Sequence, residues 1–187
     1  MGDTNFYRKL LFMNNGQFDH RSQQGNERSL GPESFMRIFV DTEFTDFIDC
    51  DLISVGLAAE DGREFYGERS DFDMRACSEF VRAAVLPQLG QYVDRVFTRD
   101  ALAVELRAWL DQLALEETLT LSFDYGGDWE LLMDLVGELP ENCLAEQVNA
   151  CLDPKRSESY YREHGGRHHA LGDARANRYA CCLLPSG

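Results

Sequence analysis

The chain has 187 residues, 44% of them apolar, and a formal net charge of −15 at pH 7. This length and apolar content suit one folded domain with a hydrophobic core. Because nucleic-acid affinity normally comes from Lys and Arg side chains that neutralise phosphates, the charge excludes a protein that grips a duplex along its length. Any function on nucleic acid must act locally, at a chain end drawn in by metal ions.

The cellular location is indicated by what the sequence lacks. No apolar run approaches the roughly 18 residues that a membrane span needs, and the N-terminal segment does not have the pattern of a signal peptide. The six cysteines form no C-x-x-C pair, which favours reduced thiols over a disulfide framework or a zinc site. We therefore expect a cytoplasmic protein without a membrane partner.

The first 35 residues differ in composition from the rest. Residues 17–34 are polar and rich in Gln, Asn, Ser, Gly and Arg, with neither helical nor strand periodicity. Such segments rarely bury enough apolar surface to fold. We expect a poorly ordered N-terminal extension, 1–35, followed by one domain, 36–187.

A strand is predicted at residues 36–40, an apolar run that leads into Asp41 and Glu43. Alternate residues of a strand project from the same face, so both carboxylates lie on one side. Their repulsion raises both pKa values, and a hard cation such as Mg²⁺ or Mn²⁺ relieves it. D-x-E is a short and common pattern, however, and alone it is better explained as a strand end that enters a polar turn.

Two further strands are predicted to form a hairpin. Residues 51–60 alternate as a strand, Asp61-Gly62 is a strong two-residue turn signal, and residues 63–68 return antiparallel. The larger side chains of the first of these strands share one face: Ile53, Val55, Leu57 and Ala59.

Helices are predicted at 73–85 and 100–115 by apolar residues that recur every three or four positions, and both apolar stripes are core faces. The stripe of the first comprises Met74, Cys77, Phe80, Val81, Ala84 and Val85. Next come a strand at 118–123, a turn at Gly126-Gly127 and a helix at 128–136.

The end of the chain is less legible. Residues 137–160 contain a short strand or helix within 144–152, and a last helix is predicted at 168–182. Hairpin strands followed by a strand-helix unit imply an α/β protein, with a mixed sheet and helices on both faces.

Acidic and imidazole side chains in the second half of the chain complete a candidate site. Asp128 begins a predicted helix at a junction where strand ends meet a cleft; its ordinary role would be helix N-cap, and Asp124 competes with it. His168 and Asp173 are five residues apart, about 140° around an ideal helix. His168 is therefore expected in a loop or first turn, reaching toward the cleft while Asp173 points in from the helix.

Four carboxylates and an imidazole are the side chains that two-metal hydrolysis of a phosphodiester requires. Carboxylates bind the two cations, and a neutral imidazole accepts a proton from water. The candidates are Asp41, Glu43, Asp128, Asp173 and His168.

The order and spacing of these motifs resemble those of the DEDDh 3′–5′ exonucleases: D-x-E, an Asp at a strand-to-helix junction, and H-x-x-x-x-D. The chain is most similar to the RNase AS-type exoribonucleases, over residues 36–182. The shared motifs read MRIFVDTEF at 36–44, LISVG at 52–56, DGREFY at 61–66, FD at 72–73 with VLPQL at 85–89, and HHALGDAR at 168–175.

The resemblance implies an RNase H-like sheet, with the first three strands antiparallel and later strands parallel to the first. In the family, the third acidic residue is followed by apolar positions at +4 and +7, which fits Asp128. Many members have Asn four residues earlier, where this chain has Asp124. The five-residue offset to Asp173 selects His168 and leaves His169 a spectator.

The resemblance also implies a role for each candidate. Asp41, Glu43 and Asp173 would hold the catalytic metal, with Asp41 shared with a second metal. Asp128 would hold that second metal, and His168 would be the general base.

Further expectations concern the substrate. Thr42 and Phe44 would contact the terminal nucleotide. The resemblance implies two Mg²⁺ or Mn²⁺ ions, a single-stranded RNA 3′ end as substrate, release of nucleoside monophosphates, an adenylate preference and a homodimer.

Three alternatives stay open. A DNA exonuclease of repair or proofreading would use the same chemistry. An inert nucleic-acid-binding module would keep the fold, although the complete set of carboxylates argues against it. A structural zinc domain would use His164, His168 and cysteines, which lack the spacing of zinc ligands.

Overall fold

The computed structural model describes residues 35–182. Residues 1–34 of the extension expected at 1–35 lie outside this range, and Phe35 is the first residue of β1. The domain boundary at residue 36 stays a prediction. None of the helices within residues 35–182 is long and apolar enough to cross a membrane.

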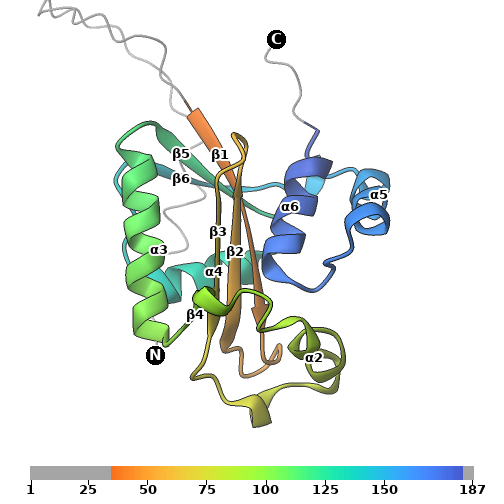
Figure 1. The fold of residues 1–187 in the computed structure, drawn as a ribbon. Coiled ribbons are helices and arrows are strands. Elements are labelled where there is room, and N and C mark those ends of the chain that lie inside the picture. The colour runs from red at the N-terminus through yellow and green to blue at the C-terminus, as the bar shows by residue number, and fades with distance from the viewer. Residues whose placement is uncertain (1–34, 183–187) are drawn as a thin grey trace, which may run out of the picture. The chain divides into compact units, whose positions relative to one another are not determined.

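A mixed sheet runs in the order β4-β3-β2-β1-β5-β6 (Figure 1). β1, β2 and β3 are antiparallel neighbours, whereas β5 pairs parallel to β1, and β6 parallel to β5. The predicted sheet is therefore confirmed. The strands are β1 (Phe35–Phe44), β2 (Leu52–Ala59), β3 (Glu64–Arg69), β4 (Val96–Phe97), β5 (Thr118–Phe123) and β6 (Cys143–Gln147).

Helices cover both faces of this sheet. α3 and α4 pack on one face, and α6 lies on the other with α5 beside it (Figure 1). The α-helices are α2 (Glu79–Ala84), α3 (Arg99–Ala114), α4 (Gly126–Val136), α5 (Pro154–His164) and α6 (Ala170–Ala180). Short 3₁₀ turns are η1 (Met74–Ala76), η2 (Leu86–Gln88), η3 (Val93–Arg95) and η4 (Asn149–Cys151).

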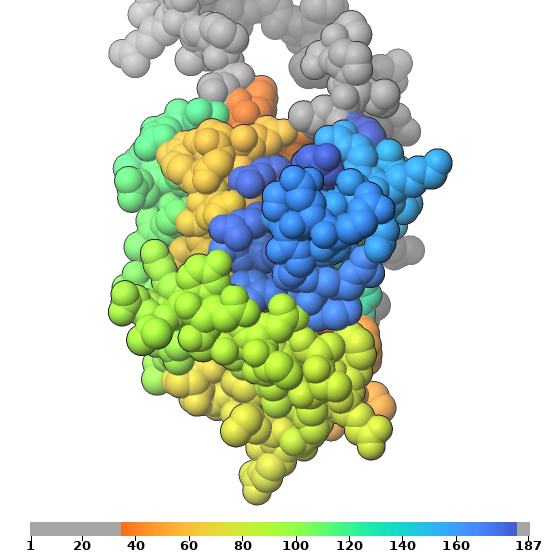
Figure 2. Space-filling model, turned by 45° about the vertical axis from the view of Figure 1, so that its right-hand side comes forward, coloured from red at the N-terminus to blue at the C-terminus, as the bar shows by residue number. Residues whose placement is uncertain are grey.

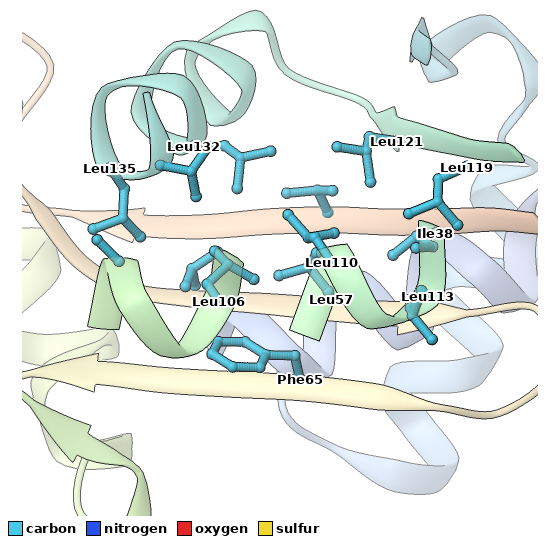
Figure 3. Close-up of a cluster of buried hydrophobic side chains, with 14 of the residues drawn as sticks. Ile38, Leu57, Phe65, Leu106, Leu110, Leu113, Leu119, Leu121, Leu132 and Leu135 are labelled. Atoms are coloured by element: carbon cyan, nitrogen blue, oxygen red, sulfur yellow. The ribbon is translucent and has the colours of Figure 1, made fainter. Parts of the chain in front are cut away.

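The main core fills the space between the sheet and helices α3 and α4. Figure 3 shows leucines of both helices gathered around Ile38 of β1 and Leu57 of β2. Burial of these side chains is the main source of folding free energy, and it fixes which face of β1 points inward. The even-numbered residues of β1 up to Val40 belong to this core.

The odd-numbered residues of β1 therefore face α6, and this is the face on which Asp41 and Glu43 lie. α6 packs against β2 closely because Gly56 has no side chain: a Cβ there would lie 2.3 Å from the backbone nitrogen of Leu171. Gly56 lies on the face of β2 opposite Val55 and Leu57, and its lack of a side chain is what admits the helix.

One residue of β2 does not follow the predicted alternation. The register shifts between Glu43, which pairs with Ser54, and Phe44, which pairs with Leu52. The intervening Ile53 is left out of the pairing and packs with Val81 and its neighbours in a second cluster. The prediction that Ile53 shares a face with Val55 is wrong, because a bulge interrupts the period of two.

The predicted helix at 73–85 is also wrong in its extent. Ser78 has an extended backbone, and its hydroxyl accepts a hydrogen bond from the Val81 N–H, so the α-helix begins only after it. Met74 and Phe80, assigned to the core stripe, are 59% and 55% exposed. The local N-cap overrides the apolar periodicity.

Other boundaries differ by a few residues. α4 begins at Gly126 and not after a Gly-Gly turn, so Asp128 lies inside its first turn and is not the N-cap, which is Tyr125. α6 begins at Ala170 with His169 as its N-cap. The illegible segment contains β6 and α5.

Substituting Gly56→Ala should destabilise the domain by roughly 3 kcal/mol, because the three atoms nearest to the new methyl group are backbone atoms of α6. Gly126→Ala is the matched control, since no atom lies within 4 Å of its added Cβ. Urea unfolding of the two variants measures the difference. Equal stability would contradict the close packing of α6 on β2.

Candidate active site

The predicted site residues gather where β1 ends, between the first turns of α4 and α6. Asp41 and Glu43 are on β1, Asp128 is in the first turn of α4, and Asp173 is in the first turn of α6. His168 lies in the loop before α6, as its offset from Asp173 predicts. Residues up to 132 positions apart thus converge because strand ends meet at one edge of the sheet.

One group combines Glu43, His168 and Asp173. Each offers a ligand atom, and these atoms lie within 4.8 Å of one another. The backbone N–H of His168 donates to Oδ2 of Asp173 over 2.9 Å, which ties the loop to the helix.

A second group combines Asp41, Asp124 and Asp128, whose oxygens also lie within 4.8 Å of one another. Oδ1 of the buried Asp128 accepts hydrogen bonds from the N–H (3.1 Å) and the hydroxyl (2.7 Å) of Thr42. Oδ1 of Asp124 accepts one from the side-chain amide of Asn177 at 3.0 Å. Both competitors for the third acidic position therefore face Asp41.

Keeping these carboxylates ionised in the folded protein costs free energy. Burial is the largest cause of the strongly raised pKa of Asp41, and repulsion adds to it, first from Asp128 and then from Asp173. Burial also raises the pKa of Glu43 to about 8 and that of Asp128 to about 7, although the hydrogen bonds from Thr42 oppose the latter increase. The expected repulsion between Asp41 and Glu43 is present, but burial outweighs it.

Asp173 is under the same constraint. Burial raises its pKa, and contacts with the Tyr161 hydroxyl and the His168 N–H oppose the increase. Its Oδ1 atom is buried and makes no hydrogen bond among the described residues. Tyr161 was not identified from the sequence because α5, the helix that carries it, begins within residues 137–160, where the sequence shows no clear pattern.

These residues fit divalent cations. Five carboxylates offer hard oxygen ligands, and the unpaired Oδ1 of Asp173 has a free ligand position. Burial and, after it, mutual repulsion raise the pKa values of Asp41 and Glu43, and cations would neutralise the repelling charge. No cysteine and no His164 occurs in either group of the described residues, so the zinc alternative gains no support.

The two residues expected to contact substrate lie differently. The Thr42 hydroxyl is taken up by Asp128. Phe44 lines a pocket of about 270 Å³ together with Phe47 and Tyr125. Its ring is stacked on Tyr125, with centroids 6.4 Å apart, and meets Phe47 edge-on at 5.1 Å.

Phe47 and Tyr125 are 77% and 50% exposed, and neither was singled out in the sequence, although both flank the acidic motifs.

His169 has a structural position. It is buried, its Nδ1 accepts the N–H of Gly172 as the α6 cap at 3.4 Å, and its ring stacks on Tyr66 with centroids 4.5 Å apart. It belongs to neither carboxylate group.

Comparison with known sequences gives a partial match. No protein-family model matches the chain. Two curated 3′–5′ exoribonucleases from Mycobacterium tuberculosis, of strains CDC 1551 and H37Rv, are each 39% identical to it over 77 residues, which are 40% of this chain and 46% of the relative. The match therefore spans about half the length of these relatives, and the resemblance to 3′–5′ exonucleases is confirmed over that part.

Comparison with solved structures concerns the fold. A structure of exonuclease I has a TM-score of 0.51 at 13% identity, and a zinc-bound complex of Escherichia coli exonuclease I with single-stranded DNA has 0.52 at 12%. Each match covers 78% of this chain and 39% of the other. They confirm the RNase H-like fold.

The raised carboxyl pKa values predict how stability depends on pH. Because the folded protein without metal retains protons that the unfolded chain releases above pH 4–5, its free energy of unfolding should fall as pH rises toward 8. Glu43→Gln removes one such group and should stabilise the metal-free protein by roughly 1–3 kcal/mol at pH 8.5 and much less at pH 4.

Thermal unfolding in a chelator, with the exposed Glu105→Gln as control, measures this difference. A Glu43→Gln variant less stable than the parent at pH 8.5 would contradict the buried, repelled state of Glu43.

Proposed function

We propose that the protein is a metal-dependent 3′–5′ exoribonuclease that releases nucleoside monophosphates from single-stranded RNA ends. The observation that carries the proposal is the pair of three-residue groups around Asp41 and Glu43, with an imidazole in one of them. The names of the mycobacterial relatives support this activity and the choice of RNA.

The residues divide the work as follows. Glu43 and Asp173 would hold one cation and Asp128 the other, with Asp124 within reach. Asp41 would be shared between the two cations, as the resemblance implies. When bound, Mg²⁺ or Mn²⁺ would acidify water and offset charge on the phosphate and the leaving oxygen. His168 accepts the proton of the attacking water at a ring nitrogen.

One neighbouring polar residue serves the geometry of the site. Thr42 holds Asp128 through two hydrogen bonds, so its role in substrate binding is indirect. This rigidity matters because a carboxylate that shifts by an ångström no longer matches its cation.

The aromatic pocket supplies the place for a base. An exposed ring such as Phe47 or Tyr125 stacks on a nucleobase irrespective of its identity. Glu130 and Asp134 also line the pocket and repel the phosphate backbone, so only a terminal base can enter while its phosphate reaches the carboxylates. An adenylate preference and a homodimer complete the proposal and rest on the resemblance alone, whereas the cytoplasmic location stays the expectation drawn from the sequence.

The function is tested with 5′-labelled RNA and DNA single strands of one sequence, incubated with Mn²⁺. The proposal expects stepwise shortening of RNA from its 3′ end, and loss of this activity in Asp41→Ala. Cleavage of DNA alone would favour the DNA exonuclease. Identical traces for the parent and Asp41→Ala would favour the inert module.

A second prediction separates the two competing acidic residues. Asp128→Asn should lower kcat by more than 100-fold, because it removes a buried charge from the group around Asp41. Asp124→Asn should cost less than tenfold, because the amide oxygen can still accept the hydrogen bond from Asn177. Single-turnover rates at saturating Mn²⁺ compare the two variants. A larger loss for Asp124→Asn would exchange their roles.

A further inference from the structure

The loop that carries His168 has a backbone that must be held in place. His168 has a φ of 63°, which lies in the left-handed region that residues other than glycine rarely adopt. No other non-glycine residue of the described chain has a positive φ. Such a conformation persists only where surrounding contacts impose it.

Those contacts come from Gln88, at the end of η2 and about 80 positions earlier in the chain. Its side-chain nitrogen donates to the carbonyl oxygens of Arg167 at 2.6 Å and His168 at 2.8 Å, and it also lies 2.8 Å from the carbonyl oxygen of Ala84. Figure 2 shows the segment around residues 80–95 packed against the segment that leads into α6.

The two carbonyl groups belong to the peptide planes on either side of the His168 Cα atom. The first plane is held at both ends, since its N–H also donates to Asp173. Because peptide groups are planar, fixing both planes fixes φ and ψ of His168 and therefore the direction of its Cα–Cβ bond. On α2, the ring of Phe80 meets the imidazole edge-on, with centroids 4.9 Å apart.

We infer that Gln88 is a positioning residue for the general base: it keeps the His168 imidazole beside Glu43 and Asp173 without touching substrate. This inference rests on the proposed function. It gives the segment from α2 to η2 a role in catalysis, namely to impose the backbone of the loop that it contacts.

The test uses Gln88→Met, which keeps an unbranched side chain of similar length and removes both N–H donors. Gln91→Met is the matched control, because Gln91 is exposed and only three residues away. We expect kcat to fall at least tenfold in Gln88→Met with KM within twofold, since general-base catalysis contributes 10²–10⁴-fold. The control should match the parent.

Combination with His168→Ala separates positioning from a general structural role. If Gln88 acts through His168, adding Gln88→Met to His168→Ala lowers the residual rate no further. A second tenfold loss in that background would overturn the inference.

A measurement on the metal-free protein gives a readout independent of activity. Exchange of the His168 backbone amide, followed by NMR, should be at least tenfold faster in Gln88→Met and unchanged in Gln91→Met. Unchanged exchange in Gln88→Met would overturn the inference. If Gln88→Met does not fold, Gln88→Glu, which also lacks the N–H donors, decides by the same measurement.

The outcomes also distinguish the two claims. If the parent degrades no nucleic acid, the proposed function fails, while amide exchange still decides whether Gln88 holds the loop.

Discussion

Five carboxylates crowd around the end of β1, and the rest of the fold must hold them there against their mutual repulsion. Burial and like charge both raise the pKa values of Asp41, Glu43 and Asp128, so this region opposes folding of the metal-free chain above neutral pH. The free energy that offsets this cost comes from the other face of the same strands, where leucines of α3 and α4 bury apolar area against the sheet (Figure 3). One strand thus serves stability on one face and chemistry on the other.

This division between the two faces of the sheet depends on a glycine in β2 and on the N-cap of α6. α6 can bring Asp173 to the site only because Gly56 lets the helix backbone approach β2. The same helix begins at Ala170 with His169 as its N-cap, which leaves His168 in the preceding loop. The spectator histidine therefore sets the position of its neighbour. Gln88 then holds the backbone of the loop that carries His168 through two hydrogen bonds.

Much of this could be predicted from the sequence, because two kinds of signal are local. Strand alternation and the Asp61-Gly62 turn gave the antiparallel hairpin, and the five-residue offset placed His168 outside the helix that carries Asp173. Contacts between distant segments were not legible. The bulge at Ile53 depends on pairing with β1, and the helix that carries Tyr161 is mostly polar and contains no buried residue. For the same reason, the hydrogen bonds of Gln88 could not be foreseen.

The most direct test of this account is a crystal structure of the protein soaked in Mn²⁺, with the ions located by anomalous scattering. The account predicts two peaks in each chain, one contacting Glu43 and Asp173 and one contacting Asp128, with Asp41 touching both. Peaks at other sites, or an absence of peaks at saturating Mn²⁺, would show that the crowded carboxylates do not exist to hold cations, and the nuclease chemistry would have no basis.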